Sequence, residues 1–350
     1  MAYRKWLIFS LIISMLCMSA VFALAQDPET TYFDLYSPQA VVPRRNLQFT
    51  DPGAVVVHDG TFYMFHNGFN FWPGRVGVYL SISEDGYTWE RVDNQPIFGI
   101  DDVPFGGFTA LATSAVVDDD GTWVMYYYVM TEEENFPPIS IGRATAPEAI
   151  GPWTANAEPV LTQGAEGTWD SFAVTQPSVI RTDDGYVMHY MGTDGETARI
   201  GMATSDDGIA WTKYDDPDTT EDLYAESDPV IYSMDNADLP ENQQQVWQPS
   251  VQLTPDGWVM IFKNGVGQLA NGSMIYVATS DDGINWTIDY NRFPIHFRDL
   301  PMGRSVWFTR LIYNEGTYFI YEELGTVDPS IGLITSVYLS TYTGSLPIGE

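Results

Sequence analysis

The residues of this 350-residue chain that could do chemistry occupy one repeated position. Five apolar segments each place a residue nine positions before the glycine of a turn signal, and these residues are Asp51, Ala112, Gln176, Gln248 and Trp307. Asp51 is the one carboxylate in this set. A carboxylate can act as a general acid, base or nucleophile, whereas amides and aromatic rings suit a neutral, hydroxylated ligand. The set therefore suits a sugar-like ligand, and acid–base cleavage of such a ligand would need a second carboxylate near Asp51.

The second carboxylate must come from a segment beside these positions. Asp170 in GTWDSF is the first candidate, because it lies just before the third repeated segment, and Glu322 in YEELG, next to Glu323, is the second. We expect Asp51 to act as base or nucleophile and Asp170 or Glu322 as acid. The alternatives are a structural cap on the Asp-Pro turn for Asp51, and sugar binding or rim solvation for the other two. Side chains expected to bind the sugar are Trp72, Arg75, Phe108, Trp169, Gln176, Trp247, Gln248, Arg304 and Trp307.

A long internal repeat must position these residues. ATSDDGIAWT at 203–212 returns as ATSDDGINWT at 278–287, and SISEDGYTWE at 81–90 is a close variant. Each belongs to a unit of four short strands joined by Asp-Gly turns. Five such units predict an all-β, five-bladed β-propeller of four-stranded antiparallel blades. The expected blades are 51–98, 112–161, 176–231, 248–295 and 307–343, within a single domain from 26 to 350.

The last unit lacks a fourth strand, and we expect residues 30–36 to supply it and so close the ring. Trp89, Trp153, Trp211 and Trp286 of the repeated hairpins are expected to pack between neighbouring sheets. The Asp-rich turns should lie at one end of the propeller and the irregular loops at the other, where ligand-binding groups belong.

Composition and the N-terminus narrow the class of protein further. The formal net charge is -32, so polyanions are repelled and no nucleic-acid partner is expected. Arg4 and Lys5 precede an apolar run and Ala23-Leu24-Ala25, which predicts a signal peptide over 1–25. A membrane anchor is the alternative. We expect a secreted protein, extracellular or periplasmic, without a membrane partner after cleavage and monomeric.

No cofactor is expected from the sequence. Four scattered histidines, and no cysteine after Cys17, give no transition-metal cluster with recognisable spacing. Structural calcium at the Asp-rich turns is an alternative, although aspartate already has a role in turns.

Several motifs resemble a known group. The DP of TDPGAVV, DGTFYMF, ATSDDGxxWT and APEAIGPWT look like the arabinanase, invertase and levansucrase superfamily of five-bladed glycosidases, closest in style to glycoside hydrolase family 43. The resemblance spans about 45–343. It implies an Asp base at Asp51, but Ala115 and Thr175 stand where the family has its second Asp and its Glu. The triad is thus incomplete.

The incomplete triad leaves four functions open. One is a glycosidase acting on oligo- or polysaccharide, and another is a propeller that binds sugar without cleaving it. A sialidase is suggested by the Ser-x-Asp-Gly-x-x-Trp turns, but five blades are too few for it. A scaffold for protein partners is the last alternative.

Overall fold

The computed structural model describes residues 33–72, 74–130, 139–234, 244–265, 274–290, 294–295 and 305–346. The chain divides into Met1–Thr30 and Thr31–Glu350, and the expected signal peptide at 1–25 lies outside the described residues. No helix in the described ranges has the length and apolar character needed to cross a bilayer.

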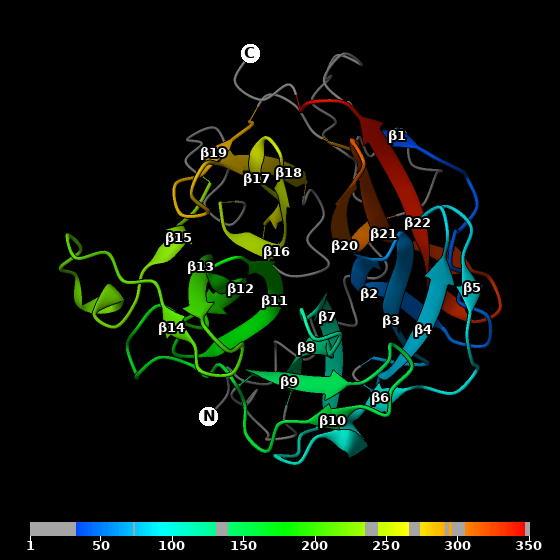
Figure 1. Ribbon diagram of the computed structural model, residues 1–350, viewed down its shortest axis with the longest axis horizontal. Coiled ribbons are helices and arrows are strands. Elements are labelled where there is room, and N and C mark those ends of the chain that lie inside the picture. Colours follow the sequence, from blue (N-terminus) through cyan, green and yellow to red (C-terminus); the bar gives the residue numbers. More distant parts are fainter. Residues whose placement is uncertain are drawn as a thin grey trace. The chain divides into compact units, whose positions relative to one another are not determined.

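Five antiparallel sheets form the part from Thr31 onward, and they surround a common axis (Figure 1). The predicted five-bladed β-propeller is thereby confirmed. Blade 1 contains β2 Phe49–His58, β3 Thr61–Phe69, β4 Gly77–Ser83, β5 Glu90–Arg91 and β6 Phe98–Gly99. Blade 2 contains β7 Thr109–Val117, β8 Trp123–Met130, β9 Ser140–Ala146 and β10 Thr154–Ala155.

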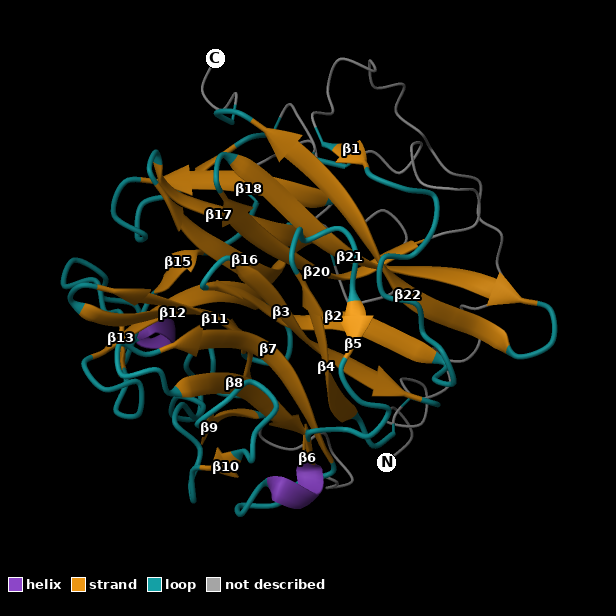
Figure 2. Ribbon diagram, turned by 45° about the vertical axis from the view of Figure 1, so that its right-hand side comes forward, coloured by secondary structure: helices purple, strands orange, loops and turns teal. Residues whose placement is uncertain are grey.

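The other three blades repeat this order. Blade 3 contains β11 Ala173–Thr182, β12 Gly185–Thr193, β13 Ala198–Ser205, β14 Thr212–Lys213 and β15 Pro229–Ile231. Blade 4 contains β16 Val246–Thr254, β17 Gly257–Asn264, β18 Ile275–Ser280 and β19 Thr287–Ile288. Blade 5 contains β20 Ser305–Asn314, β21 Thr317–Asp328 and β22 Gly332–Thr343, and it is completed by β1 Asp34–Leu35. Strands dominate the described chain, with short 3-10 turns at Ile100–Asp102 and Asp222–Tyr224 (Figure 2).

The N-terminal strand closes the ring as expected. Asp34 pairs with Thr341 and Leu35 with Ser340, so β1 covers the free edge of β22. Phe33 is buried beside the rings of Tyr318 and Tyr342. Closure removes an open sheet edge, which would otherwise be a template for aggregation.

A β-bulge interrupts the innermost strand of every blade at the same level. The shifts in register fall between Asp51 and Ala54, Ala112 and Ser114, Thr175 and Ser178, Trp247 and Ser250, and Val306 and Thr309. The five residues of the nine-residue spacing therefore lie within a bulge or directly before one. Bulges re-aim side chains and are common next to active sites.

Each pair of neighbouring blades shares an apolar core. Phe65 and Tyr127 lie in the core between blades 1 and 2, and Ile261 and Leu324 lie in that between blades 4 and 5. Hydrogen bonds near the axis also link the blades. Ser114, Ser178 and Ser250 each accept a bond from the backbone amide of the next blade, at Val179, Val251 and Leu311, all at 2.9 Å.

The repeated hairpin is a structural link, as predicted. In blade 3, Trp211 packs edge-on against Tyr126 and Tyr186, and its indole donates to the carbonyl of Gly208 at 3.1 Å. The hydroxyl of Tyr126, in blade 2, donates to the same carbonyl at 3.0 Å. Trp89 and Trp286 make the same indole bond in blades 1 and 4, and Trp153 packs on Phe65. The near-identical sequences therefore join adjacent blades.

Candidate active site at the propeller axis

Asp51 is a buried carboxylate with one oxygen fixed and one free. Its Oδ1 accepts hydrogen bonds from the Gly53 amide at 2.7 Å and from Asn67 Nδ2 at 2.9 Å. Its Oδ2 has no hydrogen-bond partner among the described residues. Burial raises the pKa of Asp51 to about 6, against the opposing effects of Asn67 and Arg310. Asp51 can thus gain or lose a proton near neutral pH.

Arg310 is the cation that accompanies Asp51. It is buried on β20, where its Nε donates to the carbonyl of Gly53 and its Nη1 donates to that of Thr309 at 2.8 Å. Burial lowers its pKa to about 10, and the charge of Asp51 acts in the opposite direction. Arg310 also lines an axial channel of about 180 Å³ bounded by all five innermost strands.

Glu323 is the acid whose charge interacts with Asp51. It is 1% exposed on β21. Burial raises its pKa to about 8, and the negative charge of Asp51 adds to the rise. Neither oxygen of Glu323 makes a hydrogen bond of standard geometry within the described ranges. Burial therefore favours the protonated form of Glu323, and its interaction with Asp51 makes ionisation of both acids at once unfavourable.

Lys263 supplies a second buried cation. Its Nζ donates to the carbonyls of Val306 and Trp307, at 3.0 Å each, and burial lowers its pKa to about 8. The carboxylate of Glu323 opposes that fall. Sequence reasoning missed Glu323, Arg310 and Lys263 as functional residues. The signal for the two cations was present, because each is a single charge within an apolar strand, VMIFKN or SVWFTRLIY.

Glu322 faces away from this group. Side chains alternate along a strand, so Glu322 shares the face of β21 with Ile320 and Leu324, which pack against blade 4. Glu323 shares the other face with Phe319 and Tyr321, which pack against blade 1. Burial raises the pKa of Glu322 to about 8, and Ser340 offsets part of the rise.

Asp170 lies away from the position expected for it. It is fully buried in blade 3, where Lys213 Nζ, on the outer strand β14, contacts its Oδ2 at 2.6 Å, and the hydroxyl of Tyr190 donates to the same oxygen at 3.2 Å. Trp169, expected as an exposed stacking ring, is also fully buried, and its indole donates to the Ser227 carbonyl at 2.8 Å. The loop packs onto its own blade, where these partners satisfy Asp170 Oδ2 and the Trp169 indole, whereas Asp170 Oδ1 has no hydrogen-bond partner among the described residues.

The other predicted residues divide into two sets. Gln176, Gln248, Trp247 and Trp307 lie at the bulges beside the axis. By contrast, Arg75 is exposed and pairs with Asp101 at 2.6 Å. Phe108 is half-buried, and its backbone amide donates to the Met130 carbonyl. Arg304 lies outside the described residues.

Aromatic rings from blades 1 and 5 gather at the Asp51 end of β2. The centroids of Phe49 and Phe69 are 4.9 Å apart, those of Phe49 and Trp307 are 6.5 Å apart, and Trp72 lies 5.6 Å from Phe69. Trp72 and Trp307 are half-buried, so each retains some exposed ring surface. Such rings can stack on the apolar face of a sugar.

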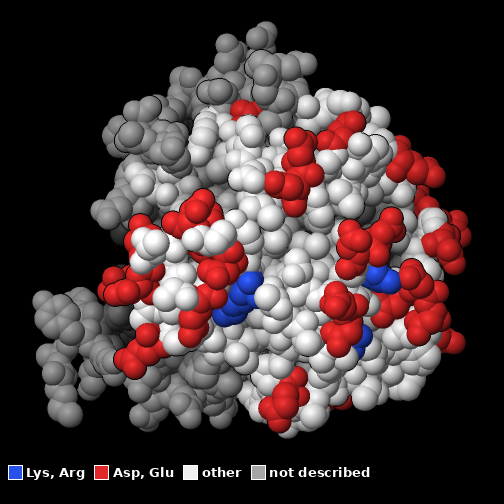
Figure 3. Space-filling view, turned by 60° about the vertical axis from the view of Figure 1, so that its left-hand side comes forward, with Lys and Arg blue, Asp and Glu red and all other residues white. Residues whose placement is uncertain are grey.

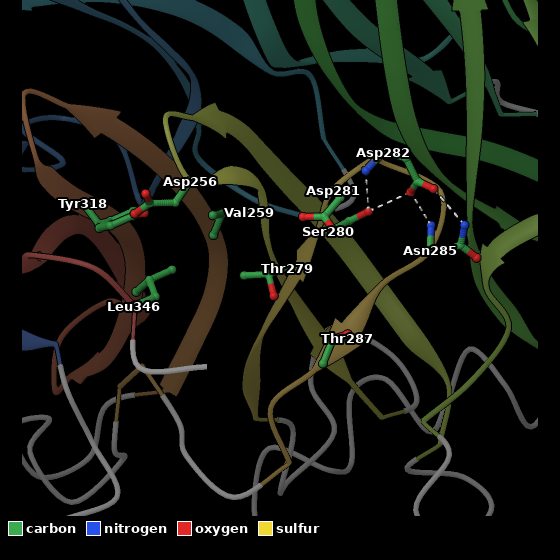
Figure 4. A pocket seen from close by; sticks show the side chains of 10 residues that line it. All are labelled: Asp256, Val259, Thr279, Ser280, Asp281, Asp282, Asn285, Thr287, Tyr318 and Leu346. Carbon is green, nitrogen blue, oxygen red and sulfur yellow. Dashed lines mark hydrogen bonds between the residues drawn. The ribbon is translucent and has the colours of Figure 1, made fainter. Parts of the chain in front are cut away.

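A larger cleft of about 450 Å³ lies at the turn end of blade 4, among Asp256, Ser280, Asp281, Asp282 and Tyr318 (Figure 4). The turn already uses Asp282, whose Oδ1 accepts bonds from the amides of Ile284 and Asn285 at 2.9 and 2.8 Å. Across the described residues, no three His, Cys, Asp or Glu side chains are arranged to hold a metal ion.

Acidic side chains are spread over the face drawn in Figure 3, with few Lys or Arg among them. This distribution agrees with a neutral ligand rather than a polyanion.

The propeller, with buried carboxylates and amides at one level of its axis and aromatic rings nearby, is characteristic of the five-bladed glycosidase class of carbohydrate-active proteins.

Comparison with known protein families identifies the family within this class to which the chain belongs. The chain belongs to glycoside hydrolase family 130, described as β-1,4-mannooligosaccharide phosphorylase, which matches residues 109–307. The expected superfamily is thereby confirmed, and within it the family is 130. The matched segment begins at the first strand of blade 2 and ends in blade 5, so Asp51 and Glu323 both lie outside it.

Individual relatives are distant. An uncharacterized protein of Mycobacterium tuberculosis, MT1551, is 28% identical over 168 residues, which is 45% of this chain and 52% of that protein. A solved structure of a BT0996 complex with RGII is 17% identical, covers 93% of both chains and has a TM-score of 0.63. A second solved structure is described as showing that family 130 of mannoside phosphorylases contains glycoside hydrolases that target β-1,2 mannosidic linkages in Candida mannan. It is 17% identical, covers 92% of this chain and 97% of its own, and has a TM-score of 0.63. These structural likenesses concern the fold.

Proposed function

We propose that this protein is a secreted glycoside hydrolase that cleaves glycosidic bonds of an oligo- or polysaccharide at the Asp51 end of the propeller axis. The observation that carries the proposal is a second buried acid that interacts with Asp51. The charges of Asp51 and Glu323 act on each other, Oδ2 of Asp51 has no hydrogen-bond partner among the described residues, and burial raises the pKa of both acids. Two carboxyl groups held in different protonation states can divide the acid and base roles of glycoside cleavage.

Each acid has one role. Glu323, in its protonated form, donates its proton to the oxygen of the leaving group. Asp51, ionised, acts on the opposite side of the sugar ring, as base for a water molecule or as nucleophile. Asn67 and Gly53 fix one oxygen of Asp51 and leave the other free for this step. This pairing replaces Asp170 and Glu322 by Glu323 as the partner of Asp51.

Phosphorolysis is the second candidate, and the description of the family favours it. It would require cations at the site to bind phosphate. Arg310 interacts with Asp51 and Lys263 interacts with Glu323, and both cations already donate hydrogen bonds to backbone carbonyls. This arrangement supports water as the acceptor.

The test is aglycone release from a panel of aryl glycosides, including mannosides, with and without inorganic phosphate. We expect at least one substrate to be cleaved without phosphate, and Asp51→Asn to lower kcat/KM by about 10²–10⁴-fold, the usual contribution of an acid–base group. Strict dependence on phosphate, with a sugar phosphate as product, would establish phosphorolysis instead. Binding on a glycan array without turnover of any substrate would contradict both enzymatic proposals.

A further inference from the structure

Two glutamines at the axis have an unusual backbone conformation. Gln176, on β11, has φ of 53°, and Gln248, on β16, has φ of 54°. Both lie in the bulges of innermost strands of adjacent blades. Positive φ is costly for any residue with a side chain, apart from Asn or Asp in local turns. Such strain persists where the surrounding structure enforces it, often at functional sites.

Three other described non-glycine residues have positive φ, and each has a simpler explanation. Arg45, with φ of 52°, is exposed in a turn. Asp59, with φ of 48°, and Glu315, with φ of 47°, are exposed and precede a glycine in two-residue hairpin turns, which require this conformation. In the bulge of blade 1, the residue with positive φ is a glycine, Gly53, at 55°. A Cβ at this position would lie 2.0 Å from the Phe65 carbonyl oxygen. Blades 3 and 4 keep a glutamine where glycine would be less strained.

The side chains of both glutamines are buried without full hydrogen bonding. Gln176 is 4% exposed and Gln248 is 1% exposed, and the Oε1 atom of each has no hydrogen-bond partner among the described residues. A buried carbonyl without a partner is unfavourable unless a ligand completes it. Two adjacent blades share this feature at the level of Asp51.

The chain after each glutamine is held firmly. A proline follows both, at Pro177 and Pro249, and restricts the backbone. One residue further on, Ser178 and Ser250 bind the amides of Val251 and Leu311 in the next blade. The two amides are therefore presented by a rigid part of the ring, as a selective site requires.

We propose that Gln176 and Gln248 are paired specificity residues that bind two hydroxyl groups of the sugar lying next to Asp51. This inference rests on the proposed function. An amide offers one acceptor and two donors, so it matches a hydroxyl group, which is both donor and acceptor. Amides cannot neutralise a carboxylate, and Asp51 lies at the bulge of another innermost strand of the same ring. The pair therefore selects a neutral sugar and excludes a uronic acid at this position.

The test uses glycine, which accepts positive φ without strain. We expect Gln176→Gly and Gln248→Gly each to lower kcat/KM on the preferred aryl glycoside at least 10-fold while leaving Tm unchanged or raised. Asp59→Gly and Glu315→Gly relieve the same φ at exposed turns, and as matched controls they should leave kcat/KM within two-fold.

Deoxy analogues of the substrate provide a readout that a structural role would not produce. Removing one sugar hydroxyl should lower kcat/KM for the wild type, and the same removal should have little further effect in the glycine variant that has lost the matching amide. Glycine variants with wild-type kcat/KM, or equal losses on every deoxy analogue in wild type and variant, would overturn the inference. The proposed function would survive that result, because its own test is Asp51→Asn.

Discussion

Glu322 and Glu323 are neighbours in the chain, equally buried, and they have different surroundings. Glu323 interacts with Asp51 and Lys263, whereas Glu322 lies on the opposite face of β21. Burial raises the pKa of each to about 8, far above the ordinary value of 4.5. We therefore expect Glu323 to take part in chemistry and Glu322 to affect stability.

Glu322→Gln should make the protein more stable at alkaline pH. The Glu322 pKa is about 8 in the fold and near 4.5 in the unfolded chain, so unfolding releases a proton between these values. Stability is therefore fully present below pH 4.5 and is lost as pH rises to about 8. Glutamine does not ionise, so the Glu322→Gln variant avoids this loss of stability. We expect the Tm of Glu322→Gln to exceed that of the wild type at pH 8 and to equal it at pH 4. Equal values at both pH values would show that Glu322 is not held protonated.

The repeated hairpin of a four-stranded blade connects that blade to the neighbouring blade. Trp211 is half-buried and contacts the rings of Tyr126 and Tyr186, from two different blades. Because these contacts cross between sheets, losing them should weaken the junction of blades 2 and 3 in particular.

Trp211→Ala should lower the free energy of unfolding by about 2–3 kcal/mol, somewhat below the cost of removing a fully buried tryptophan. Urea unfolding of the variant and the wild type measures this difference in the free energy of unfolding. Ile209→Ala, in the same hairpin but 45% exposed, is the control and should cost within about 0.5 kcal/mol. Equal losses for the two variants would mean that the tryptophan does not join the blades.

Closure of the ring is a property of the whole molecule. β1 pairs with the edge of β22, and Phe33 inserts its buried ring beside blade 5. A chain lacking residues 1–36 should therefore unfold at lower temperature and aggregate through the exposed β22 edge. A chain lacking only residues 1–30 keeps these contacts and should match the Tm of a chain lacking only the predicted signal peptide at 1–25. Scanning calorimetry with light scattering compares the two, and equal Tm values would contradict the closing role of β1.

The fold followed from sequence because each repeat carries its own turn and strand signals. The exact position of the turn differs between blades. Asp59-Gly60 and Glu315-Gly316 form the two-residue turns in blades 1 and 5, but in blades 3 and 4 the pairings place the turn at 183–184 and 255–256. A nine-residue spacing cannot reveal this shift of one residue, so the alignment of Asp51 with Gln176 is correct only to the level of the bulge.

The site was predicted less completely than the fold. Alternation shows that Glu322 and Glu323 face opposite sides, but the sequence does not say which side meets blade 1. The partner of Asp170 is Lys213, 43 residues away on the outer strand, and no local pattern indicates such a contact. Asp51 was identifiable because it is the single acid in a repeated position.

The central claim is that Asp51 works with Glu323, and kinetics of the two neighbouring glutamate variants test it most directly. The measurement is kcat/KM against pH for wild type, Glu323→Gln and Glu322→Gln on the preferred aryl glycoside. We predict that the wild type loses activity above about pH 8 as Glu323 loses its proton, that Glu323→Gln falls about 10²–10⁴-fold, and that Glu322→Gln stays within a few-fold of wild type. An active Glu323→Gln variant that keeps the alkaline limb, or an inactive but folded Glu322→Gln variant, would contradict the account.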